Sequence, residues 1–113
     1  RLIEHISKRE AKLAMQILES MKNNDRNSIG LLIWILARDC QALNALKESN
    51  NNLRSFNIWN NQVKWYNEIA KRISIQQIKN SIENLDKADK ALKGIIDGDP
   101  WRNAKDVVLE LSA

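Results

Sequence analysis

The stretch IGLLIWILARDCQALNALKE, residues 29–48, decides the fold of this chain. Apolar side chains recur in it at helical spacing, which predicts one long helix. The regularly spaced apolar positions are Leu32, Leu36, Cys40 and Leu43. In the first half of the stretch, Ile33, Trp34 and Ile35 make the remaining sides apolar as well. A helix that is apolar nearly all round is normally buried, so we expect this helix at the centre of a helical bundle.

One helix is expected before this stretch and another after it. Ser7 and Glu10 match the capping-box pattern, which predicts a helix that begins there and is broken at 23–25. The polar run 49–52 is expected to be a loop. The next helix is predicted to begin near Trp59. Its apolar stripe, which we assign to the core, consists of Trp59, Val63, Tyr66, Ala70 and Ile73.

Two final helices complete the pattern. Ser74 and Gln77 form a second capping-box pattern, and the helix that follows is predicted to stop at Gly94. Asp99 and Pro100 are an N-cap residue and a first-turn proline, which predict the start of the last helix. The apolar stripes are Ile75, Ile78, Ile82, Leu85 and Leu92 in one, and Trp101, Ala104, Val108 and Leu111 in the other. The sequence therefore predicts an all-α fold, a compact bundle of about five helices.

The composition fits a single helical domain over residues 1–113. Hydrophobic residues make up 43% and charged residues 28%, as in globular domains, while 3 glycines and 1 proline leave few residues for β turns. The longest apolar run, 31–37, is too short for a membrane span, so we expect no membrane partner and a cytoplasmic location. The chain begins at Arg1 rather than methionine, and we expect it to be the carboxy-terminal fragment of a longer protein.

The residues needed for catalysis are scarce. His5 is the one histidine and Cys40 the one cysteine, so the chain cannot assemble a multi-histidine or multi-cysteine metal centre, and we expect no nucleophile–histidine pair. Cys40 lies on an apolar stripe, where a thiol normally behaves as a small buried hydrophobe. None of the three glycines belongs to a phosphate-binding loop. We therefore expect no catalytic, cofactor-binding or metal-binding residues, and no enzymatic activity in this fragment.

Two groups of residues leave alternatives open. Three acid-then-base pairs at i,i+4 favour a solvated, self-paired helix face over a surface that follows DNA. They are Glu83–Lys87, Asp86–Lys90 and Asp89–Lys93. Asp89 also continues an apolar stripe, so it either bonds Lys93 at the edge of the stripe or makes a specifying contact to a neighbouring helix or subunit. Trp65 faces away from the stripe of its own helix and covers either a second apolar surface or a partner.

From about residue 14 to residue 111 the chain resembles the carboxy-terminal domain of the delta subunits of bacterial DNA polymerase III clamp loaders. The segments that carry the resemblance are Leu31 to Lys47, Phe56 to Trp59, Arg72 to Ser74, LDKADKALKG at 85–94, and Asp99 to Trp101. The resemblance implies a collar domain that joins equivalent domains of the gamma/tau and delta-prime subunits in a ring. The parent would be a non-catalytic subunit of the polymerase holoenzyme, which helps to load the sliding clamp onto primer-template DNA. The clamp itself would be contacted only by an amino-terminal module outside this chain.

The resemblance also directs attention to particular residues. We expect subunit-interface surface on the third to fifth predicted helices, with Trp65, Asp89, Lys93 and Trp101 as contributors. The loop around Ile95 and Ile96 would lie near DNA, where family members can place an aromatic ring. Isoleucines offer an apolar wedge there, or they pack beneath the last helix. Gln62 stands where the family often has a basic residue. The alternative functions are a stand-alone helical nucleic-acid-binding module and a helical fragment of another multi-subunit assembly.

Overall fold

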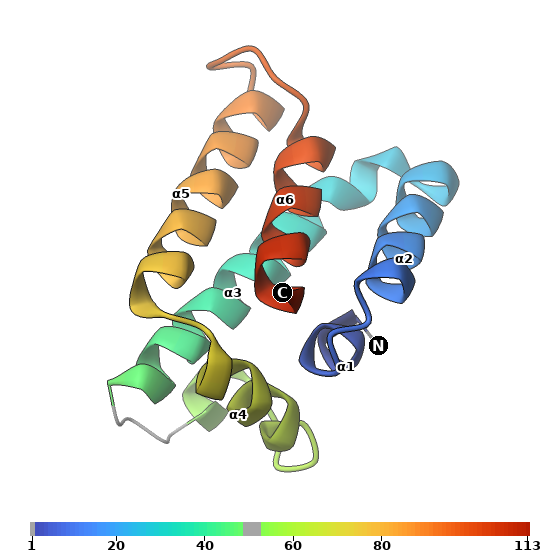
Figure 1. The fold of residues 1–113 in the computed structure, drawn as a ribbon. Coiled ribbons are helices and arrows are strands. Elements are labelled where there is room, and N and C mark those ends of the chain that lie inside the picture. Colours follow the sequence, from blue (N-terminus) through green and yellow to red (C-terminus); the bar gives the residue numbers. More distant parts are fainter. Residues whose placement is uncertain (1, 49–52) are drawn as a thin grey trace.

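The computed structural model describes residues 2–48 and 53–113, and over these residues the chain is a bundle of α-helices without a strand. The predicted all-α class is confirmed (Figure 1). The helices are α1 (Leu2–Ser7), α2 (Ala11–Asn24), α3 (Ile29–Lys47), α4 (Val63–Arg72), α5 (Ile75–Leu92) and α6 (Pro100–Ser112), with short 3-10 turns at Arg26–Ser28 and Leu53–Phe56. The loop predicted at 49–52 lies outside the described residues.

The bundle is built around α3. This helix packs against α5, α6 and α4, while α2 lies along α6 and α1 packs between α2 and α4 (Figure 1). The predicted stripe of α3 is fully buried: Leu32, Leu36, Cys40 and Leu43 all belong to the core. From the other helices the core receives, among others, Leu18, Tyr66, Ile69, Ile78, Val108 and Leu111. The apolar periodicity of residues 29–47 thus determines where the core lies.

The predicted central position of α3 in the bundle is confirmed, but the apolar first half of the helix is not covered on every side. Leu31 and Trp34, in its apolar first half, each leave 58% of their surface exposed. The described neighbours of α3 cover the side that carries Leu32 and Leu36, and they leave the opposite side of the first two turns open. The segment Arg26–Lys47 is long and apolar enough to cross a membrane by length and composition alone, but half of its apolar 18-residue window is buried inside the bundle, as in the core helix of a globular domain.

The helix boundaries around α5 and α6 are confirmed. Ser74 and Gln77 form the complete capping box, with the Gln77 amide donating to Ser74 Oγ at 3.0 Å and the Ser74 amide donating to Gln77 Oε1 at 2.8 Å. Gly94 ends α5 at φ +75°, a left-handed conformation that glycine adopts without steric cost. Asp99 caps α6 by accepting from the amide of Trp101 at 3.0 Å. Short-range signals therefore place these two helices correctly.

Two predicted helix starts are wrong. Ser7 ends α1 instead of capping the next helix, and its hydroxyl donates to the carbonyl of Glu4 at 2.7 Å. The chain then turns through Arg9, at φ +58°, before α2 begins. Trp59 lies before α4 in a turn and is 59% exposed, so it is not a core residue. In both places the turn geometry overrides a sequence pattern that fits a helix.

Candidate functional site

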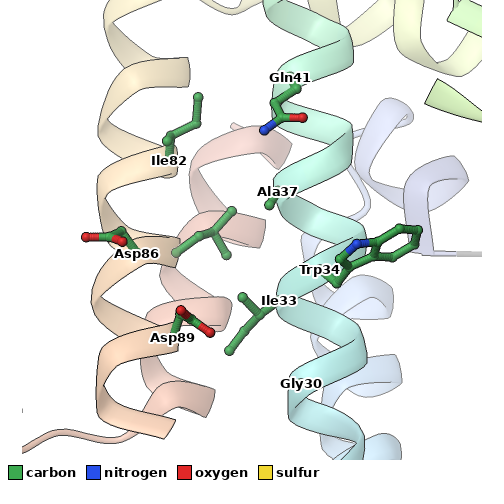
Figure 2. A pocket seen from close by; sticks show the side chains of 9 residues that line it. Gly30, Ile33, Trp34, Ala37, Gln41, Ile82, Asp86 and Asp89 are labelled. Carbon is green, nitrogen blue, oxygen red and sulfur yellow. The ribbon is translucent and has the colours of Figure 1, made fainter. Parts of the chain in front are cut away.

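A groove of about 390 Å³ runs along the outside of the bundle between α3 and α5 (Figure 2). Ile33 and Ala37 lie on the side of α3 that faces α5 (Figure 2), and the buried Leu85 of α5 also lines the groove. The remaining lining residues are Gly30, Trp34, Gln41, Ile82, Asp86 and Asp89. Trp34 forms the α3 edge of the groove, and its ring turns away from α5 (Figure 2). The groove is therefore mostly apolar, with polar groups along its edges.

The α5 wall exists because only part of the predicted stripe of this helix is buried. The buried face consists of Ile78, Ser81, Leu85 and Ala88. Ile75, Ile82 and Leu92, which the sequence pattern assigns to the same stripe, are exposed large hydrophobic residues. The helix α5 is rotated about its axis so that this buried face packs against α6. The small residues Ser81 and Ala88 on this face let the two helices approach closely. Ile82 is thereby left at the edge of the groove.

The ionisable groups that line the groove are acidic. Asp86 and Asp89 both belong to α5, and each accepts from a lysine one turn later, Lys90 at 2.9 Å and Lys93 at 2.8 Å. Asp89 points toward Ile33 across the groove, whereas Asp86 points away from it (Figure 2). The expected bond between Asp89 and Lys93 is confirmed. The third expected pair on α5, Glu83 with Lys87, is not an ion pair in the part of the chain that the structure describes.

A buried polar network lies inside the bundle, behind the exposed face of α3. Asp39 is only 3% exposed, accepts from the Tyr66 hydroxyl at 2.6 Å and pairs with Arg38 at 3.2 Å. Burial raises the pKa of Asp39, against the lowering effects of Tyr66 and Arg38. The guanidinium of Arg38 also lies 5.8 Å from the ring centre of Trp34. This network was not predicted from the sequence. It could have been predicted from Asp39, a charged residue directly before Cys40 on a helix that is expected to be buried.

The four predicted interface residues do not form one surface. Trp101 is 4% exposed and packs in the core, so the prediction that it presents a surface to a partner is wrong. It belongs to the buried face of α6, together with Ala104 and Val108. Trp65 is half-buried on α4, with Lys64 5.6 Å from its ring centre. Asp89 is in the last turn of α5 and Lys93 directly follows the helix. This end of α5 is the one that lies away from α4 (Figure 1).

The loop between α5 and α6 is exposed. Ile95 retains 66% of its surface and is therefore not packed beneath the last helix, whereas Ile96 retains 41% and is partly covered. A second exposed feature lies before α4, where Arg54 stacks 5.4 Å from the ring centre of Trp59. These apolar and aromatic groups are available for contact with other molecules.

The two residues weighed for reactivity have ordinary structural environments. Cys40 is buried, and burial raises the pKa of its thiol to about 12, which keeps it protonated and unreactive. His5 is half-buried, and its Nδ1 lies 3.0 Å from Glu10 Oε1. Among the described residues, no three histidine, cysteine or acidic side chains gather as a metal site.

No family model matches the chain, and no curated protein matches its sequence.

Proposed function

We propose that this chain is a subunit-assembly domain, the collar domain of a clamp-loader delta subunit that helps to load a sliding clamp onto primer-template DNA. Its partners are the equivalent domains of the gamma/tau and delta-prime subunits. Its role is geometric: packing between helical bundles holds the loader subunits at fixed spacing.

The exposed apolar face of α3 carries this proposal. Leu31 and Trp34 are large hydrophobic residues on one side of a helix whose other side is in the core, and both are more than half exposed. Ile82 extends the apolar surface across the groove. Contiguous apolar surface of this kind marks contact sites, and buried tryptophans contribute strongly to protein interfaces. A helical neighbour would complete the burial that the first half of α3 lacks.

Substitution of Trp34 by glutamate tests the assembly role. We expect the wild-type chain to form a complex with gamma/tau and delta-prime subunits at micromolar concentration, measured by size-exclusion chromatography with light scattering. Trp34→Glu should weaken binding about 30-fold or more, because it removes an exposed aromatic ring from the proposed contact surface and buries a charge there. Leu109→Glu is the matched control, since Leu109 is an exposed apolar residue on α6. Absence of any complex would contradict the assembly role.

The second candidate function is nucleic-acid binding by the chain itself. The specific observation that favours it is the pair formed by Trp59, 59% exposed, and Arg54 stacked against its ring. Exposed aromatic rings beside cations are typical of surfaces that stack bases of single-stranded nucleic acid. The net charge of +4 also favours nucleic-acid binding.

A salt titration with single-stranded DNA separates the two candidates. A nucleic-acid-binding module should bind a fluorescent oligonucleotide with an affinity that falls steeply as salt rises, because counterions are released from the phosphates. Trp59→Ala should then cost about 1–3 kcal/mol of binding free energy, the usual contribution of one stacked base. Trp34→Glu should have a smaller effect than Trp59→Ala. If the isolated chain shows no DNA affinity at low salt, the stand-alone role is excluded.

A further inference from the structure

We infer that the groove between α3 and α5 binds one amphipathic helix of a partner subunit, and that a lysine or arginine of that helix pairs with Asp89. This inference rests on the proposed assembly function and identifies the surface and the chemistry of the contact.

The shape of the groove fits a helix. It extends along α3 from Gly30 to Gln41, about 16 Å at the rise of an α-helix, which is roughly three turns. Gly30 and Ala37 lie two turns apart on the same face of α3, so no large side chain of α3 fills the groove at these positions. Small residues let two helices approach closely, and an apolar channel between two helices accommodates the apolar face of a third. The exposed Ile82 on α5 provides the second apolar wall.

The charge of the groove selects the partner. Both ionisable residues that line it are aspartates, although the chain as a whole has a net charge of +4. Of the two, only Asp89 points into the groove (Figure 2), and a carboxylate there disfavours nucleic-acid phosphates and anionic membrane surfaces and attracts a cationic side chain. The present partner of Asp89 is Lys93, whose side chain is 62% exposed and can turn outward into solvent. A partner cation can therefore replace Lys93 when it enters the groove.

A second copy of this chain fits the groove less well than a different helix does. The exposed face of its own α3 carries apolar groups beside Arg38, which resembles the required pattern. However, Arg38 bonds the buried Asp39 and lies within 3.5 Å of the Tyr66 hydroxyl. If Arg38 turned toward Asp89 of another copy, the buried Asp39 carboxylate would lose its ion-pair partner. An unpaired charge inside a protein is strongly unfavourable.

Three variants test the groove in the complex with the loader subunits. Ala37→Trp fills the groove without changing its charge, and Asp89→Lys reverses the charge that faces it. Each should raise the dissociation constant about tenfold or more. Glu83→Lys is the matched control, because Glu83 is exposed on the same helix and does not line the groove; it should change the dissociation constant less than about twofold. Circular dichroism establishes that each variant folds.

The outcomes separate the groove from the assembly role. If the complex forms and both groove variants bind like the wild type, the groove inference is overturned while the assembly role stands. If no loader subunit binds, the assembly role fails, and the groove is then tested with two synthetic helices, one of leucine and lysine and one of leucine and glutamate.

The readout for the synthetic helices is the indole N–H signal of Trp34 in an NMR spectrum, assigned with Trp34→Phe among the 4 tryptophans. We expect the lysine helix to shift this signal and the glutamate helix to leave it in place, even though the net charge of the chain opposes the lysine helix. Equal shifts with both helices, no shift with either, or a shift caused by raising the concentration of the chain alone would each overturn the inference.

Discussion

Replacing Arg72 by methionine should destabilise the bundle by about 3–5 kcal/mol, because hydrogen bonds from the charged Arg72 guanidinium hold three segments of the chain together. Its guanidinium donates to the carbonyls of Ser7 at 2.9 Å and Leu111 at 2.8 Å, and also to those of Ile6 and Ala113. These carbonyls belong to the ends of α1 and α6, where the final carbonyl groups lack partners within their own helices.

The position of Arg72 at the end of α4 explains the size of the effect. A methionine of similar length retains the apolar stem but leaves the carbonyls of two helix ends without a cation, and helix C-termini favour positive charge. Burial lowers the pKa of Arg72, which is the signature of a cation withdrawn from water into this contact.

Urea unfolding followed by circular dichroism measures this change. Arg72→Lys should fall between the wild type and Arg72→Met, since one ammonium group cannot reach four carbonyls arranged around a planar guanidinium. Lys71→Met is the matched control: Lys71 is exposed and pairs with Glu68 at the surface, so we expect a change below about 0.5 kcal/mol. A loss for Arg72→Met no larger than that of the control would contradict the proposed role.

Tyr66→Phe should destabilise the protein by about 2–4 kcal/mol at neutral pH. The hydroxyl of Tyr66 donates to the buried Asp39 carboxylate at 2.6 Å, and phenylalanine fills the same space without this donor. The carboxylate would then rely on Arg38 alone. Thermal or urea unfolding gives the difference, and Phe56→Leu, at a half-buried position outside the network, is a control that should cost less.

The pH dependence of Asp39→Asn distinguishes the charge from the packing. The pKa of Asp39 is raised in the folded protein, first by burial, so the unfolded chain loses its proton at lower pH than the folded chain does. This group therefore makes folding less favourable as pH rises from about 4 through the folded pKa, and it has no such effect below both values. The amide that replaces the carboxyl group in the variant cannot titrate. We expect the stability of the wild type relative to Asp39→Asn to fall as pH rises through this range, measured by urea unfolding at several pH values. A difference that is constant with pH would show that Asp39 does not titrate there.

The ends of α5 and α6 were predicted correctly from short sequence motifs at the helix termini. The Ser74–Gln77 capping box, the left-handed Gly94 and the Asp99 cap each act within about one turn of the chain, and their outcome depends little on distant residues. The Ser7–Glu10 pattern failed because it was equally compatible with a helix end, and the turn through Arg9 decided between the two.

The sequence alone determined that this chain is an all-α bundle organised around residues 29–47, because apolar periodicity depends only on the spacing of side chains along a helix. It did not determine which apolar positions would remain uncovered. The tertiary structure decided that Leu31, Trp34 and Ile82 are exposed and that Trp101 is buried, because the neighbours of each helix set its rotation about its own axis. It also decided that Arg72 joins the ends of two helices.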